Sequence, residues 1–336
     1  MASLREVAAL AEVSPMTVSN VLNGRPSVSP AIRRRVEKAL RETGYVRNEA
    51  ARALRAGRTK VVGVLAIEAV NPFYGELVAG IEEGLDGEDV LVVTATSHAR
   101  RERELVALRR FAELRVRGVI ATASSYDDEL RAAFQSLSDS GVPVVLVADT
   151  DDGFETCTVS GDDRAGGRLA AEHLAALSVT GLGYLAGPVE SVVHRRRVDG
   201  FREVLTESGL ELTGALDCPG DGLADGLTGG RRLLTSTPRP RAVFCTNDLL
   251  ALGLLQAATE AGLSVPDELA VLGYDDIPFA AGAAVPLSSV GQDTRTMGRE
   301  AARLLQAETS ARDDHRHQHL VVPPAVLART STQPAR

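Results

Sequence analysis

The first 45 residues alternate short apolar stripes with polar turns, a pattern that predicts small packed helices. An apolar stripe at helical spacing lies over 4–11 and predicts the first helix. Ser14 and Pro15 mark the start of a second helix, because a serine N-cap accepts a backbone hydrogen bond and proline fits the first helical position. This helix is expected over 15–22, with Val18, Val21 and Leu22 buried and an outward face of Pro15, Met16, Thr17, Ser19 and Asn20.

A third helix is expected after Ser29 and Pro30, which repeat the same start signal, and Gly44 is suited to its C-terminal cap. Two short helices joined by a tight turn and supported by a third are typical of a helix-turn-helix DNA-binding domain. A small helical cap on a larger domain is the alternative. Such a cap would not require exposed hydroxyl and amide groups beside arginines.

Continuous apolar runs alternate with amphipathic segments from residue 61 onward. The runs are VVGVLAI, LVVTAT, GVIATA, VPVVLVA, GLGYLAG, AVFCT and LAVLGYD. Apolar runs separated by amphipathic helices predict parallel sheets that are covered on both faces. The length fits two such sheets, so the expected fold class is α/β, with a two-lobed, doubly wound body following the helix-turn-helix head.

Polar residues follow several of the predicted strands, where ligands bind in open α/β sheets. Arg197 lies near the start of a helix that is expected to face the same cleft. Asn, Asp and Arg side chains together suit a polar or polyhydroxylated small molecule. Helix capping by the two aspartates near 275 and a solvated position for Arg197 are the alternatives. The residues that follow strands are 71–74, Asp149, Asn247, Asp248, Asp275 and Asp276.

Composition limits the class of protein. The 336 residues suffice for two or three domains. No apolar run approaches the roughly 20 residues of a membrane helix, and the N-terminus lacks a signal-peptide core, so we expect a cytoplasmic protein without membrane contact. Cys157, Cys218 and Cys245 are widely spaced, which argues against a disulfide framework or zinc site and favours small core residues.

The net charge of −8 hides an asymmetry between the two parts of the chain. The first 60 residues contain 12 Lys and Arg against five Asp and Glu, a net +7, so the remainder carries −15. A basic head on an acidic body indicates that the head binds a polyanion.

Head and body together resemble the LacI/GalR family of bacterial transcription regulators. VAALAEVSPMTVSNVLNG is similar to the family's helix-turn-helix signature, and VSPAIRRRVEKALRETGYVRNEAARALR to its third helix and hinge. The segments NPFYGEL, RRRVDGF, FCTNDLLALG, VLGYDDIP and LVVPPAVLARTST are similar to its periplasmic-binding-protein-like core. The resemblance covers nearly the whole chain.

This resemblance implies which head residues contact double-stranded operator DNA. It places Glu12 where the family usually has glycine, and a left-handed backbone there would cost about 1 kcal/mol. Hydroxyl and amide groups can bond phosphate oxygens, and Asn can pair with an adenine edge. The implied base-reading residues are Pro15, Met16 and Asn20, and those near phosphates are Thr17, Ser19 and Asn23.

The segment NEAARALRAGRTK places Ala51 and Leu54 on one face of a short helix, with Arg55 among the arginines around them. A helix this short is marginal in water by itself. The resemblance implies that it forms on DNA, where Leu54 from each of two subunits enters the minor groove and kinks the duplex. The alternative for Leu54 is a core contact with the next domain.

In the body, the resemblance implies that Arg197 and Asp275 hold a small-molecule effector, that Asn247 assists, and that Phe73 or Tyr74 lines the N-terminal lobe. Asp149 is a further candidate, with Ala148 as the alternative alignment. The polar residues and the lack of tryptophan favour a carbohydrate or its phosphate. No cofactor is expected.

Catalytic and metal-binding roles are not expected. GDGLADGLTGG matches neither a dinucleotide-binding loop nor a P-loop and is interpreted as a surface loop, and no GxSxG motif occurs. His315, His317 and His319 alternate, but no Cys or carboxylate has the spacing of accompanying ligands, so we interpret them as part of a polar loop.

A solute-binding protein for transport shares the two-lobed core and is the competing function. The DNA-binding head argues against it.

We therefore predict a homodimeric repressor that binds operator DNA and is controlled by an effector between two lobes. Whether the effector releases the protein from DNA or promotes binding stays open. The predicted domains are the head over 1–47, the hinge helix and linker over 48–60, and the effector-binding and dimerisation core over 61–336. The predicted lobes are roughly 61–160 with 292–320, and 161–291 with 321–333.

Overall fold

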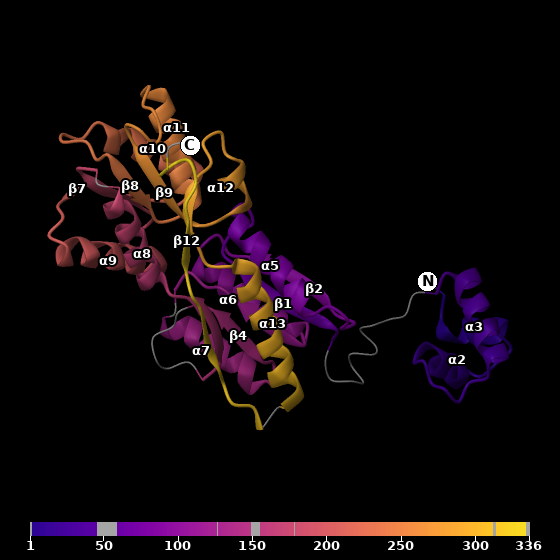
Figure 1. Cartoon of the computed structure of the whole chain (residues 1–336). Coiled ribbons are helices and arrows are strands. Elements are labelled where there is room, and N and C mark those ends of the chain that lie inside the picture. Colours follow the sequence, from indigo (N-terminus) through magenta and orange to yellow (C-terminus); the bar gives the residue numbers. More distant parts are fainter. Residues whose placement is uncertain are drawn as a thin grey trace. The chain divides into compact units, whose positions relative to one another are not determined.

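The computed structural model describes residues 2–45, 59–125, 127–148, 155–177, 179–311 and 314–333. The chain divides into two compact units, Met1–Thr59 and Lys60–Arg336 (Figure 1). Of the predicted hinge over 48–60, only Thr59 and Lys60 are among the described residues.

The first unit contains three helices around a small apolar core. Each begins at a serine N-cap whose hydroxyl accepts a backbone hydrogen bond, as the sequence predicted for the second and third. Gly44 ends the third with φ of 59°, in the left-handed region that favours glycine. Leu22 is half-buried rather than fully buried. The helices are α1 (Leu4–Leu10), α2 (Pro15–Leu22) and α3 (Pro30–Thr43).

The first sheet of the second unit is parallel throughout, in the order β11-β5-β4-β3-β1-β2. Its strands are β1 (Val61–Ala66), β2 (Leu91–Thr96), β3 (Gly118–Ala121), β4 (Val144–Val147), β5 (Cys157–Gly161) and β11 (His319–Val322). Two apolar clusters show that α5 and α13 cover one face and α6 and α7 the other. These helices are α5 (Pro72–Gly84), α6 (Arg101–Glu113), α7 (Asp128–Asp139) and α13 (Thr294–Ala311).

The second sheet has the order β12-β10-β9-β8-β6-β7, and only β12 runs antiparallel to its neighbour among the described strands. Its strands are β6 (Leu182–Ala186), β7 (Leu212–Asp217), β8 (Ala242–Cys245), β9 (Ala270–Asp275), β10 (Ser288–Gly291) and β12 (Ala325–Leu327). Helices α8 and α9 cover one face of this sheet, and α10 and α11 cover the other. The short helix α12 follows β9. These helices are α8 (Asp163–Ala176), α9 (Val192–Glu207), α10 (Leu223–Leu234), α11 (Asp248–Glu260) and α12 (Pro278–Gly282).

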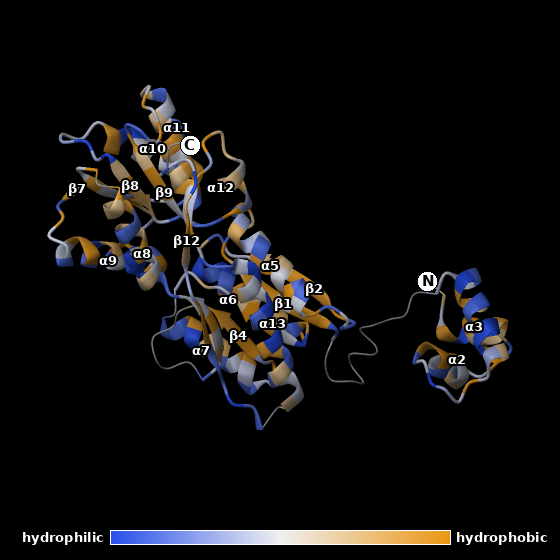
Figure 2. Ribbon diagram, in the orientation of Figure 1, coloured by the Kyte–Doolittle hydropathy of each residue, from blue (hydrophilic) through white to orange (hydrophobic). Residues whose placement is uncertain are grey.

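Two mostly parallel sheets with helices on both faces confirm the predicted α/β fold class. In Figure 2 the strands are mostly hydrophobic, whereas the helices show hydrophobic and hydrophilic residues side by side. All three cysteines are buried, as predicted. No helix in the described part of the chain is long and apolar enough to span a bilayer.

The chain passes between the two sheets at three places within the described residues, after β5, β10 and β11. Figure 1 shows the last of these crossings as the yellow C-terminal segment, which runs from one sheet to the other. The first two crossings touch each other, because a Cβ atom added to Gly161 would lie 1.8 Å from Oε1 of Gln292. A side chain at residue 161 would therefore have to displace the amide of Gln292.

The interpretation of GDGLADGLTGG as a surface loop was wrong. Most of this segment is the first part of α10, which begins at Leu223. Its glycines allow close helix packing, since a Cβ atom on Gly226 would lie 2.4 Å from the backbone oxygen of Leu250 in α11. Glycine lowers helix propensity, so the packing function of these residues is not visible from local pattern.

Candidate DNA-binding helix and effector-binding residues

The polar residues of α2 are held by contacts at both ends of the helix. The Ser14 hydroxyl accepts a hydrogen bond from the Thr17 backbone N–H at 3.1 Å and lies 2.9 Å from the Thr17 hydroxyl. At the other end, Nδ2 of Asn23 donates to the Ser19 hydroxyl at 3.4 Å. These bonds fix the backbone of α2 and orient two hydroxyl groups along it.

The predicted DNA-contacting residues of the head lie at different depths on α2. Pro15, Met16 and Asn23 are exposed, and 69% of the Met16 surface is accessible. Thr17, Ser19 and Asn20 are half-buried, and Val18 and Val21, which lie between and after them, are buried. The helix therefore exposes Met16 strongly, whereas Thr17, Ser19 and Asn20 are less exposed than the sequence predicted.

The turn between α1 and α2 contains a left-handed residue, at the position where the resemblance places Glu12 instead of the usual glycine. Glu12 has φ of 50°, a conformation that costs a side-chain-bearing residue about 1 kcal/mol. Arg35 of α3 donates to the Ala11 carbonyl at 2.7 Å and to the Glu12 carboxylate at 2.9 Å. These bonds tie the turn to α3 and oppose the strain.

Four predicted site residues lie outside the described residues: Ala51, Leu54, Arg55 and Asp149.

Arg197 of α9 is 5% exposed and lies between two buried carboxylates. Its Nε donates to Asp163 at 2.8 Å, and its Nη1 donates to Asp275 at 3.0 Å and to the Thr246 carbonyl at 2.6 Å. The solvated position considered for Arg197 is therefore wrong. Arg197 instead joins α9 to the start of α8 and to the carboxyl ends of β8 and β9.

Asp275 ends β9 and does not cap a helix, since Ile277 is the N-cap residue of α12. It has φ of 98°, which turns the chain sharply at the end of the strand. Burial raises the pKa of Asp275 to about 6, although the Arg197 guanidinium opposes this shift. Nε2 of Gln292 lies 3.5 Å from the same carboxylate, so Asp275 also adjoins a segment that crosses between the sheets.

Asn247 is 2% exposed and is the N-cap residue of α11. Its Oδ1 accepts from the Leu250 backbone N–H at 2.8 Å, and its Nδ2 donates to the Asp221 carbonyl at 2.9 Å. The amide thus orders the loop before α10 as well as the start of α11. Asn247 lies after the same strand as Thr246, which contacts Arg197.

Phe73 and Tyr74 lie in the first turn of α5, and their rings meet edge to face at 5.2 Å. Both are half-buried. Phe73 packs against the apolar cluster beneath α11 of the second sheet, so this turn of α5 contacts the opposite lobe.

Sequence reasoning missed residues that complete the surroundings of Arg197. Asp163 follows β5, a strand that the sequence did not predict. His194 lies one helical turn before Arg197, and its ring contacts the Thr246 hydroxyl at 2.9 Å and Asp221 at 3.4 Å. Tyr274 lies under Arg197, whose guanidinium carbon is 3.6 Å from the ring centroid. The spacing of His194 from Arg197 could have indicated a shared helix face.

Comparisons with known proteins agree with this arrangement. The model of bacterial regulatory proteins of the lacI family matches residues 3–48, and that of the periplasmic binding protein-like domain matches residues 171–332. The HTH-type transcriptional regulator CelR of Thermobifida fusca is 37% identical over 315 residues, which cover 90% of each chain.

Two solved structures match nearly the full length. The Lac repressor bound to ONPG in the repressed state has a TM-score of 0.86 at 27% identity, covering 98% of this chain and 99% of that one. The complex of the transcriptional regulator CelR with cellobiose has a TM-score of 0.72 at 32% identity, covering 98% and 100%. The resemblance predicted from the sequence is confirmed, and this chain belongs to the lacI family of bacterial regulatory proteins.

Proposed function

We propose that this protein is a transcription repressor that binds its operator as a homodimer and is controlled by a small polar effector. The observation that carries the effector proposal is the buried pair of Arg197 and Asp275 at the carboxyl end of β9. A fixed guanidinium and carboxylate close to Asn247 offer hydrogen-bond donors and acceptors of the kinds that bind sugar hydroxyls. The cellobiose and ONPG complexes of similar proteins support a carbohydrate or carbohydrate derivative.

On the DNA side, the exposed edge of α2 is proposed to enter the major groove. Met16 and Asn20 would contact base edges with Pro15, while Thr17, Ser19 and Asn23 would bond phosphates. Ala51, Leu54 and Arg55 would form the hinge contact in the minor groove, with Leu54 as the apolar wedge. Experiments can distinguish the base-contacting residues from the phosphate-contacting residues, because only the former should affect sequence preference.

Coupling between the sites is proposed to run through the segments that cross between the lobes. Gln292 lies beside Asp275 and against Gly161 of another crossing, so a ligand on Asp275 would alter the packing of two crossings together. A change in lobe orientation would then alter the spacing of the paired hinges. Allosteric coupling of this kind is typically about 1–3 kcal/mol.

We assign no catalytic activity to the chain and place its action in the cytoplasm, where operator DNA is accessible. A solute-binding protein for transport is the competing function. The match of residues 3–48 to the lacI family supports the regulator instead.

A thermal-shift panel tests the effector proposal. Purified full-length protein is screened with cellobiose, other disaccharides, pentoses, hexose phosphates and purines. A ligand at about 100 times its dissociation constant adds about 2.7 kcal/mol of stability. We expect a sugar to shift the wild type and the exposed-site control Arg195→Ala, but not Arg197→Lys. A shift by a purine, or an equal sugar shift in Arg197→Lys, would overturn the proposed ligand class or site.

A further inference from the structure

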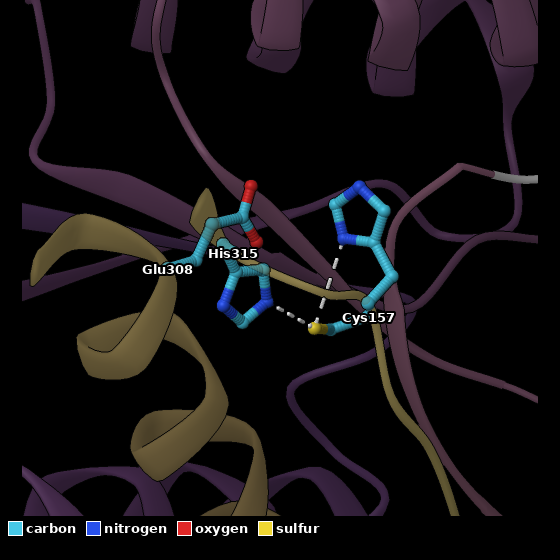
Figure 3. A group of neighbouring side chains, drawn as sticks. Cys157, Glu308 and His315 are labelled. Atoms are coloured by element: carbon cyan, nitrogen blue, oxygen red, sulfur yellow. Dashed lines mark hydrogen bonds between the residues drawn. The ribbon is translucent and has the colours of Figure 1, made fainter. Parts of the chain in front are cut away.

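Four side chains with metal-binding atoms meet at one end of the first sheet, away from Arg197 (Figure 3). Cys157 is the first residue of β5, and Glu308 lies in the last turn of α13. His315 and His317 lie in the segment between α13 and β11. One thiol, two imidazole nitrogens and one carboxylate oxygen all lie within 4.8 Å of one another.

The sulfur-to-nitrogen separations agree with a shared tetrahedral ion. Sγ of Cys157 lies 3.1 Å from Nε2 of His315 and 3.9 Å from Nδ1 of His317. Zinc bonds of about 2.3 Å to sulfur and about 2.1 Å to nitrogen, at a tetrahedral angle, place these atoms about 3.6 Å apart. The two distances lie on either side of that value, one at 3.1 Å and the other at 3.9 Å.

The surroundings of Cys157 and Glu308 favour a cation. The Gln318 backbone N–H donates to Sγ at 3.4 Å, a contact that stabilises a thiolate. Oε2 of Glu308 is buried and has no hydrogen-bond partner among the described residues. A buried carboxylate oxygen without a partner is costly, and a positive ion would offset this cost.

We propose that Cys157, Glu308, His315 and His317 bind one divalent transition-metal ion of the zinc class. A thiolate and two imidazoles select zinc-class metals over calcium or magnesium, which prefer oxygen ligands. The sequence expectation of a polar loop relied on ligand spacing along the chain, whereas the fold brings Cys157 next to His315 across 158 positions. This site goes beyond the proposed repressor function and does not depend on it.

The ion would join three elements of one lobe: β5, the end of α13 and the segment that leads into β11. β11 is an edge strand of the sheet, and the chain crosses to the second sheet directly after it. Metal binding to the folded state alone stabilises that state. The expected effect is therefore a higher melting temperature of the full-length protein in zinc.

Cobalt titration of the chelator-treated full-length protein tests the site. We expect one cobalt ion per chain, a thiolate-to-cobalt charge-transfer band in the near ultraviolet, and its displacement by zinc. Cys157→Ser should abolish the band. His317→Gln, at an exposed position, should weaken cobalt binding by more than about tenfold, because even the loss of an outer partner costs about 10- to 100-fold.

His319→Gln is the matched control, because His319 is also exposed but bonds the Thr158 hydroxyl at 3.0 Å instead of joining the cluster. It should bind cobalt and shift in melting temperature with zinc as the wild type does. Absence of the charge-transfer band in the folded wild type would overturn the proposal. Equal binding by the wild type, Cys157→Ser and His317→Gln would also overturn it, since that result indicates only adventitious binding.

Discussion

Arg197 donates a hydrogen bond to Asp275 across 3.0 Å, and the two residues are 5% and 8% exposed. This contact links the middle of α9 to the end of β9, where ligands bind in parallel sheets. A buried pair is costly to separate, because removing one partner leaves an unpaired charge. The pair is therefore both a structural contact and the proposed effector clamp, and substitutions must distinguish these two functions.

Arg197→Ala should lower the free energy of unfolding by about 3–5 kcal/mol, because it leaves two buried carboxylates without their cation. Arg197→Lys keeps the charge but not the planar fork, so it should fold and lose the effector response. Urea denaturation and ligand thermal shifts measure the two effects. A fully stable Arg197→Ala protein would contradict the buried contacts of the guanidinium.

Asn20→Ala should change base preference at one operator position in a randomised-site selection, because an asparagine amide reads a base edge by two hydrogen bonds. Asn23→Ala is the comparison, since loss of a phosphate contact should weaken binding about equally for all sequences. If Asn20→Ala retains the wild-type preference, Asn20 does not read bases.

Leu54→Ala should weaken binding to operator DNA more than binding to DNA of random sequence. An apolar wedge contributes only where the duplex is kinked at the centre of a specific site. Fluorescence anisotropy with both DNAs at one salt concentration measures the ratio. Equal losses on the two DNAs would remove Leu54 from the specific contact.

Glu12→Gly should be more stable than Glu12→Ala by about 1 kcal/mol, because glycine accepts the left-handed backbone at this position. Both variants lose the exposed ion pair with Arg35, so that loss cancels in the comparison. Thermal unfolding of the full-length protein measures the difference, from the unfolding transition of the helix-turn-helix head. Equal stability of the two variants would show that the turn is not strained.

Effector affinity should fall as the pH is lowered through about 6, since burial raises the pKa of Asp275 to about 6. Above this pH the folded protein holds a carboxylate that pairs with Arg197 and accepts bonds from hydroxyl groups. Below it, the carboxyl group is neutral and both interactions weaken. Calorimetric titration from about pH 7.5 to about pH 5 measures the change. Asp275→Asn should bind the effector weakly, and its affinity should depend less on pH than that of the wild type. If the two proteins show the same pH dependence, Asp275 is not the group that titrates.

Local sequence signals were sufficient to predict the helices of the head and the fold class of the body. Serine caps, proline at the first helical position and helical apolar spacing predicted α2 within its observed bounds. The long apolar strands predicted two covered sheets, because such runs are buried on both faces. These features depend on neighbours in sequence.

Features that depend on distant contacts were not predicted. β10 contains two serines, whose hydroxyls bond Asp248 and Thr332, so its burial is not apparent from hydrophobicity. Asp163 joins Arg197 only because β5 places it there. The partnership of Cys157 with the histidines likewise arises from the pairing of β5 with β11.

The central claim is that one ligand site controls operator affinity. Operator binding by the full-length wild type is measured by anisotropy with and without the sugar that stabilises it, alongside Arg197→Lys. We predict a change in operator dissociation constant of about 5- to 150-fold in the wild type, equivalent to about 1–3 kcal/mol, and none in Arg197→Lys. A sugar that binds the wild type but leaves operator affinity unchanged would contradict the account.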